Sequence, residues 1–297
     1  MGISRHAPYG RVPAQGALQV IVTSLRVTYS HHTCHTTVFL FVPDRPLQTR
    51  TDDADRGCTG VEPGPRVEGT RDLDASKVQA PGIIARPEGG FRLFYTAVGP
   101  GRSYPECQGY ILSAISEDGL DFAPEPGIRL APDPAVEHMY LRLLAPSIVR
   151  LADGRWRMYV EARGTSDRPT VITSAVSDDL LGWQHEPGVR LATPDGLGGP
   201  RLFALPGGRC RLLACGDDFG DAGRVSGKCI GKHIISAISD DGLDFTFEPG
   251  ERIRSDIDAV HAEDMSVITL GDGRQRMYYA ACDSDGRWRI ASAVSDS

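Results

Sequence analysis

The side chains best suited to acid–base chemistry in this chain are histidines and carboxylates placed close to apolar strand segments. His261, Glu263 and Asp264 stand together immediately before one such segment. A histidine beside carboxylates can titrate near neutrality, as a general acid or base requires. His138 precedes an earlier segment, and Glu161 interrupts an otherwise apolar strand, where it points either to solvent or into the interior. We predict that these five residues carry catalysis.

Other polar residues near the same segments could hold a substrate. The guanidinium of Arg142 is a planar fork that suits a carboxylate or a phosphate, so we predict an anionic small molecule as one possible ligand. Any one of these residues alone could be a solvated loop residue, and it is their recurrence at equivalent positions that favours a function. The predicted substrate-binding residues are Gln79, Tyr140, Arg142, Arg201 and Asp217.

A metal site is the alternative interpretation of the same histidines. His261 and Glu263, with His138 opposite, could ligate an ion, but His-x-Glu on an extended segment is a weak signal. We predict no metal and no cofactor.

These residues owe their equivalence to an internal repeat. The pattern Ser-Ala-(Ile/Val)-Ser begins at Ser113, Ser174, Ser236 and Ser292, at spacings of 61, 62 and 56 residues. The first three copies continue through a turn to Glu-Pro-Gly-x-Arg. A period of this length built from strand and turn signals indicates a ring of repeated sheets.

Each repeat contains four strand signals and no helix signal. An apolar strand opening with Ala-Pro or an equivalent is followed by a Gly- and Asp-rich hairpin turn, an aromatic strand, the Ser-Ala-Ile-Ser strand and a proline-containing edge strand. We predict an all-β fold, a five-bladed β-propeller with four-stranded antiparallel blades. The loops before the first strands should then meet at an axial cavity.

The N-terminal part of the chain leaves two arrangements open. Residues 57–297 are predicted to form the propeller, and residues 1–56 a divergent extension or a degenerate blade. A Glu-Pro-Gly-x-Arg motif at residues 62–66 has no Ser-Ala-Ile-Ser before it. It either completes the last repeat and closes four blades, or ends a blade built from residues 17–67. We favour the second, which gives five blades.

Composition excludes several classes of partner. The net charge is −7 with no basic cluster, which argues against a nucleic-acid binder, and no run approaches the roughly 20 apolar residues of a membrane helix. The seven cysteines include no Cys-x-x-Cys pair, so we predict reduced thiols in a cytoplasmic protein. The predicted partner is a small-molecule substrate, with neither nucleic acid nor membrane.

The repeat pattern resembles that of the five-bladed propeller glycosidases. The relevant pattern is Ala-Pro-x-Ile-Val, then Asp-Gly-x-x-x-Met-Tyr, then Ser-Ala-x-Ser-x-Asp-Gly, across about residues 60–297. It is similar to the arabinanase and β-xylosidase family and its invertase and levansucrase relatives. The resemblance implies three axial carboxylates: two aspartates in Asp-Pro motifs, one as base or nucleophile and one orienting, and an acid in a Glu-Gly-Pro motif.

This chain departs from that pattern at the motif positions. Ala80-Pro81 and Ala145-Pro146 replace Asp-Pro, and residues 198–200 read Gly-Gly-Pro in place of Glu-Gly-Pro. We therefore predict an enzyme acting by acid–base chemistry on a small polar or sugar-like metabolite: a lyase, cyclase, isomerase or hydrolase. Two alternatives remain. One is a glycoside hydrolase of the arabinanase/xylosidase type whose acids come from residues such as Asp217 or Glu161, and the other is a non-catalytic carbohydrate-binding propeller.

Overall fold

The described part of the chain is built from β-strands. The computed structural model describes residues 24–25, 37–38, 65–69, 71–99, 108–165, 168–205, 208–216, 233–250, 252–253, 261–270, 274–283 and 288–295. Within these ranges the named helical element is the 3₁₀ turn η1 (Glu137–Met139). The all-β prediction is confirmed.

The strands form four consecutive antiparallel units, here called blades one to four; a parallel bridge between Gly109 and Arg142 joins the first two into one 8-stranded sheet. Blade one comprises β3 (Lys77–Ala85), β4 (Phe91–Val98), β5 (Gly109–Ser116) and β6 (Ala123–Pro124). Blade two comprises β7 (Arg142–Arg150), β8 (Trp156–Arg163), β9 (Val171–Ser177) and β10 (Gln184–His185). Blade three comprises β11 (Leu197–Ala204), β12 (Cys210–Gly216), β13 (His233–Ser239) and β14 (Thr246–Phe247). Blade four comprises β15 (His261–Thr269), β16 (Gln275–Cys282) and β17 (Trp288–Val294).

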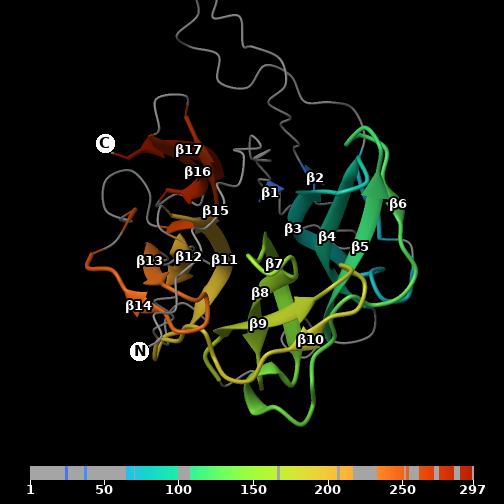
Figure 1. Cartoon of the computed structure of the whole chain (residues 1–297), viewed down its shortest axis with the longest axis horizontal. Coiled ribbons are helices and arrows are strands. Elements are labelled where there is room, and N and C mark those ends of the chain that lie inside the picture. The colour runs from blue at the N-terminus through green and yellow to red at the C-terminus, as the bar shows by residue number, and fades with distance from the viewer. Residues whose placement is uncertain are drawn as a thin grey trace, which may run out of the picture.

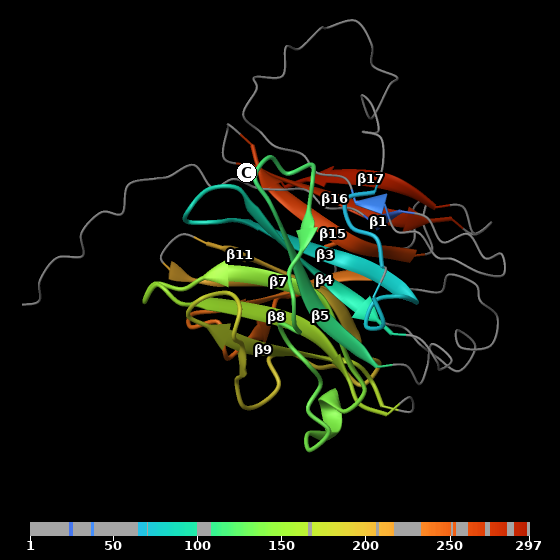
Figure 2. The same ribbon diagram turned by 90° about the vertical axis from the view of Figure 1, so that its right-hand side faces the viewer.

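The blades surround a common centre, and the first strand of each blade is its inner strand (Figure 1). In blade two, β7, β8 and β9 follow one another outwards, and the view turned by 90° shows the same order (Figure 2). A further pair, β1 (Ser24–Leu25) and β2 (Thr37–Val38), lies near β3, in the interval between blade four and blade one (Figure 1). The count of five blades stays a prediction.

Every inner strand is interrupted by a β-bulge at the same place in the repeat. The pairing with the second strand shifts between residues 79 and 82, 144 and 147, 198 and 201, and 263 and 266. The residue inside each bulge has a positive φ: 48° at Ala80, 53° at Ala145, 56° at Gly199 and 51° at Asp264. Bulges re-aim side chains, and non-glycine residues seldom adopt such φ values. Ala-Pro in the first two inner strands, and Gly199-Pro200 and Asp264-Met265 in the other two, therefore mark a bent point of each strand.

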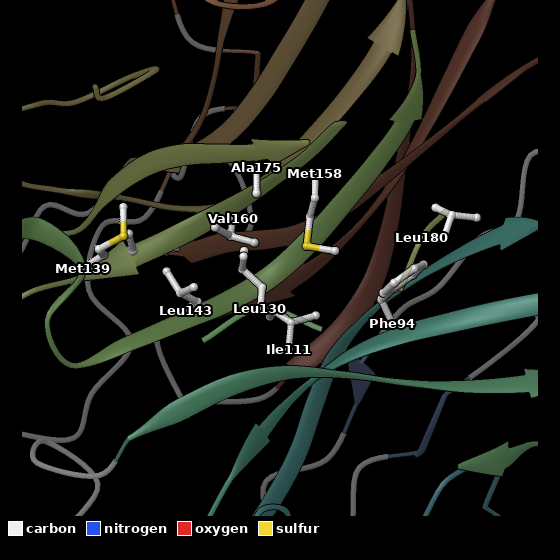
Figure 3. Close-up of a cluster of buried hydrophobic side chains, with 10 residues drawn as sticks. Phe94, Ile111, Leu130, Met139, Leu143, Met158, Val160, Ala175 and Leu180 are labelled. Atoms are coloured by element: carbon white, nitrogen blue, oxygen red, sulfur yellow. The ribbon is translucent and has the colours of Figure 1, made fainter. Parts of the chain in front are cut away.

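The hydrophobic core lies at the junctions between blades. Between blades one and two, Phe94, Ile111, Leu143 and Met158 are fully buried and pack in one cluster (Figure 3). Three further clusters centre on Leu197 and Leu212, on Ile234 and Met265, and on Tyr95 and Leu112. Each blade buries one face against the next, as the layered packing of sheets requires.

A repeated polar contact fastens the outer strand to each of the first three blades. In blade one, the guanidinium of Arg92 donates to both carboxylate oxygens of Glu125, at 2.8 and 2.9 Å, and the Ser113 hydroxyl donates to Glu125 at 2.7 Å. The same contacts recur as Arg157–Glu186–Ser174 and Arg211–Glu248–Ser236. The glutamate of Glu-Pro-Gly therefore joins the second, third and fourth strands.

Candidate active site at the inner-strand bulges

One position of the second strand contacts the bulge of the following blade. In blade one, Thr96 accepts a hydrogen bond from the backbone N–H of Ala145, with an N···O distance of 2.9 Å. In blade two the equivalent residue is Glu161, whose carboxylate accepts from the backbone N–H of Gly199 at 3.2 Å. The repeat therefore delivers a carboxylate to the bulge of blade three.

Glu161 occupies the space that a side chain on residue 198 would need. A Cβ atom built on Gly198 would lie 2.6 Å from Glu161 Oε2 and 3.2 Å from its carboxyl carbon. A glycine at this position leaves room for the carboxylate from β8. A carboxylate thus lies at the opening of β11 even though the Gly-Gly-Pro motif itself contains none.

Asp264 approaches the same glycines from the other side. It is the acidic member of the four bulge residues, and its Oδ1 lies 4.0 Å from the position of a Cβ on Gly199. Because consecutive Cα atoms are about 3.8 Å apart, the carboxylates of Glu161 and Asp264 can be separated by no more than roughly 14 Å. Both side chains are half-buried. Carboxylates from blades two and four therefore flank one glycine pair in blade three.

Arg201 adds a positive charge two residues beyond Gly199. The side chain is half-buried, and its guanidinium donates to the carbonyl oxygen of Pro200 at 2.8 Å. Burial lowers the pKa of Arg201, and the charge of Asp264 opposes that change, followed by a smaller effect of Cys215. Arg201 and Asp264 therefore interact electrostatically across the junction of blades three and four.

The predicted pair His261 and Glu263 is brought together on β15. These residues are two positions apart and so share one face of the strand. His261 Nε2 lies 3.1 Å from Glu263 Oε2, and the histidine is 7 % exposed. The pair directly precedes Asp264, so blade four contributes three of the predicted residues to adjoining positions.

His138 stands apart from the bulges. It belongs to η1, whose backbone packs against Gly164 just beyond the end of β8. Burial lowers the pKa of His138; the charge of Glu137 opposes this change, and His185 in the outer strand β10 lowers the pKa slightly further. The described residues around it belong to blade two and not to the inner strand of blade four.

The remaining predicted residues occupy varied environments. Arg142 is fully buried at the junction of blades one and two, against Gly109, which places it in the packing of the protein. Tyr140 is 48 % exposed, and Gln79 is half-buried directly before the bulge of β3. Asp217 lies outside the described residues. The structure therefore gathers Glu161, Arg201 and Asp264, with His261 and Glu263 adjoining.

Cys215 lies near these bulges although it is not among the predicted site residues. It is 3 % exposed, and its Sγ lies 3.6 Å from the position of a Cβ on Gly199. Its place in the second strand of blade three is that of Thr96 and Glu161, so an alignment of the repeats indicates that this position lies close to the bulges. Cys215 is therefore a neighbour of the site.

Two kinds of feature are absent from the described residues. No three His, Cys, Asp or Glu side chains in these ranges cluster closely enough to hold a metal ion. In the same part of the chain, no helix has the length and apolar character needed to cross a membrane.

Comparison with known proteins identifies the fold. No protein-family model and no curated protein sequence matches this chain. A structure described as belonging to "the GH130 family of mannoside phosphorylases", which "contains glycoside hydrolases that target beta-1,2 mannosidic linkages in Candida mannan", aligns with a TM-score of 0.61 at 16 % identity, covering 75 % of this chain and 68 % of that one. A glycosyl hydrolase from Bacteroides ovatus gives 0.59 at 17 %, over 75 % and 68 %. β-1,2-Mannobiose phosphorylase from Listeria innocua gives 0.58 at 14 %, over 78 % and 75 %. The chain therefore has the β-propeller fold of these glycoside hydrolases and phosphorylases, as predicted.

Proposed function

We propose that this protein is a sugar-active enzyme that uses acid–base chemistry at the inner-strand bulges of blades two to four. The observation that carries the proposal is the position of Glu161, which fills the space beside Gly198 while Asp264 flanks Gly199. The fold, which it shares with glycoside hydrolases and phosphorylases, supports a sugar substrate.

Cleavage of a glycosidic bond is the reaction that two such carboxylates favour. It needs one protonated carboxyl group to donate to the leaving oxygen and one ionised carboxylate to attack the sugar or to activate water. In our proposal Asp264 is the ionised group, since it interacts electrostatically with the positive charge of Arg201. Glu161 is then the proton donor, held in place by the backbone N–H of Gly199.

A second candidate function uses the histidine on β15. The contact of 3.1 Å between His261 and Glu263 is suited to moving a proton, as a lyase or isomerase acting on a sugar-like metabolite requires. In that reaction the pair on β15 is essential and Glu161 only binds substrate.

A panel of 4-nitrophenyl glycosides tests the proposal. We expect turnover of at least one by the wild-type protein, and a loss of about 10²- to 10⁴-fold in Glu161→Gln and Asp264→Asn. Glu117→Gln is the matched control, because the Glu117 side chain is 83 % exposed in a surface turn. Turnover that survives in Glu161→Gln but not in His261→Gln favours the second candidate. Sugar binding without any turnover indicates a non-catalytic propeller.

A further inference from the structure

We infer that Arg201 binds the negatively charged group of an acidic or phosphorylated sugar. This inference deepens the proposed function, on whose site it rests, by naming the class of substrate. The orientation of position 201 can be inferred from its equivalents in the other blades. In blade one its equivalent is Gly82, where a Cβ atom would run into the carbonyl oxygen of Pro146 in the next inner strand. In blade two it is Ser147, whose hydroxyl accepts from the backbone N–H of Leu202 in the next inner strand at 3.0 Å.

The repeat therefore directs Arg201 towards β15, the strand that carries Asp264. The electrostatic effect of Asp264 on Arg201 agrees with this orientation. The equivalent residue of blade four is Ser266. An arginine thus stands in one blade where the other described blades have a glycine or a serine.

The guanidinium of Arg201 differs in its contacts from those of the outer-strand arginines. The arginines at the outer-strand contacts, such as Arg92 and Arg211, each bind both oxygens of a glutamate. Arg201 donates only to the carbonyl of its neighbour Pro200, and no carboxylate of the described residues lies within ion-pair distance of it. A guanidinium has five N–H donors, and burying its charge without a partner is costly. A ligand anion would supply that partner.

Two carboxylates of the site, Glu161 and Glu263, have contacts of their own. Glu263 is in contact with His261, and Glu161 accepts from the backbone N–H of Gly199. Neither carboxylate binds Arg201, so the guanidinium of Arg201 can form two parallel hydrogen bonds to an anionic group of a ligand. Asp264 flanks Gly199, two residues before Arg201, so its carboxylate would face the hydroxyl groups of a sugar bound there. The site therefore suits a molecule that carries a carboxylate or a phosphate next to hydroxyl groups.

Matched pairs of small probes test this inference by calorimetry or ligand-observed NMR. The pairs are methyl glucuronide against methyl glucoside, methyl galacturonide against methyl galactoside, and glucose 6-phosphate against glucose, with inorganic phosphate alone. We expect the wild-type protein to bind at least one charged member about tenfold or more tightly than its neutral partner. Whether the uronides or the phosphate show the preference distinguishes a carboxylate from a phosphate ligand.

Variants assign the preference to the residue. Arg201→Met should remove it, Arg201→Lys should keep part of it because the charge remains, and Arg209→Met should leave it unchanged, since Arg209 is exposed in the same blade. Arg201→Gln replaces the methionine variant if that one fails to fold. The inference is overturned if charged and neutral probes bind equally, if no charged probe binds, or if the preference survives in a folded Arg201→Met or Arg201→Gln protein.

The two proposals fail separately. Turnover of neutral nitrophenyl glycosides that depends on Glu161, without any preference for charged probes, keeps the proposed function and removes this inference. A preference that depends on Arg201, without turnover of any glycoside, does the reverse.

Discussion

A carboxylate from one strand can fill the position of a side chain on the neighbouring strand if the neighbouring residue is a glycine. Gly198 and Glu161 illustrate this exchange, because the carboxylate on β8 fills the volume that a side chain at the opening of β11 would occupy. The backbone N–H of Gly199 then fixes the orientation of the carboxylate. The identity of residue 198 therefore matters as much to the site as that of residue 161.

Replacing Gly198 by alanine should disable the site through Glu161. The new Cβ would lie 2.6 Å from Glu161 Oε2, so the carboxylate must move and Gly199 loses its acceptor. We expect glycosidase activity to fall at least about tenfold and the free energy of unfolding to fall by about 1–2 kcal/mol from overpacking. Gly182→Ala is the control, because its nearest contact would be Asp179 Oδ1 at an ordinary 3.9 Å. Full activity in Gly198→Ala would show that Glu161 is not in the site.

Asp264 combines a functional group with backbone strain. Its φ of 51° matches the values of 48° at Ala80 and 53° at Ala145, so the strain belongs to the bulge and not to the aspartate. Left-handed conformations cost L-residues about 1–2 kcal/mol, and glycine relieves that cost. A glycine at this bulge would suit the backbone conformation better than the aspartate does.

Glycine substitutions separate the strain from the chemistry. We expect Asp264→Gly and Ala80→Gly each to keep or raise the free energy of unfolding, by up to about 1 kcal/mol, measured by denaturant titration. Only Asp264→Gly should abolish turnover, which would be a trade-off between stability and activity. A loss of turnover in Ala80→Gly as well would indicate that the bulge geometry, and not the carboxylate, limits activity.

At the scale of elements, the blades are held by contacts that depend on ionised carboxylates. Burial raises the pKa of Glu125, but the hydrogen bonds from Arg92 and Ser113 outweigh it, so the pKa lies below its usual value of 4.5. Burial likewise raises the pKa of Glu248, but hydrogen bonds from Arg211 and Ser236 outweigh it and lower the pKa. A carboxyl group with a lower pKa in the folded state stabilises the fold above its unfolded pKa, and that contribution is lost as the pH falls through the folded pKa.

Acid should therefore loosen the outer strands. We expect the free energy of unfolding to decrease as the pH falls below about 5, and to decrease less steeply in Glu125→Gln and Glu248→Gln. Denaturant titrations across this range measure the slopes. Glu117→Gln, a substitution in an exposed turn, should keep the wild-type slope. Equal slopes in all four proteins would mean that these contacts do not control acid stability.

The strands could be predicted from the sequence, whereas the site could be predicted only in part. Hairpin turns and alternating strands are local signals, repeated four times, and they fixed the order of the blades. The contact between Glu161 and Gly199 joins residues 38 positions apart, and nothing local announces it. Arg142 looked like a ligand anchor, but close packing against Gly109 buries it fully. Both the contact of Glu161 and the burial of Arg142 depend on residues far apart in the sequence, which local patterns do not predict.

At the scale of the whole molecule, one inter-blade contact recurs around the ring. Arg129 donates to the carbonyl oxygen of Leu181 in the next blade at 3.4 Å, and Arg190 donates to Leu243 at 3.4 Å. Arg66 makes the same contact with Leu120, also at 3.4 Å. Arg66 therefore stands where the outer-strand arginine of a blade preceding blade one would stand. That contact is expected whether Arg66 ends a fifth blade or closes blade four. The position of β1 beside β3 is what supports our proposal that residues 17–67 form a fifth blade (Figure 1).

The outer edge of blade four is relevant to the alternative in which residues 62–66 complete that blade and close a four-bladed ring. Ile290 of β17 is 38 % exposed, whereas its equivalents Ile111, Ile172 and Ile234 are fully buried under their outer strands. Within the described residues, no fourth strand covers it. The motif at residues 62–66 would cover Ile290 if it closed a four-bladed ring, so the two arrangements differ in what removal of the preceding residues does.

Deletion of residues 1–56 distinguishes a fifth blade from an extension. If residues 17–67 form a blade, removing residues 1–56 uncovers the side of β3 beside which β1 lies. We then expect the unfolding temperature to fall by about 5 °C or more, since 1 kcal/mol corresponds to about 2–4 °C for a domain of this size. Deletion of residues 1–16 is the control and should leave the temperature unchanged. Both proteins keep Arg66, so its contact with Leu120 cannot explain a difference between them. Equal unfolding temperatures would assign residues 17–56 to an extension, and the Glu-Pro-Gly strand would then be available to blade four.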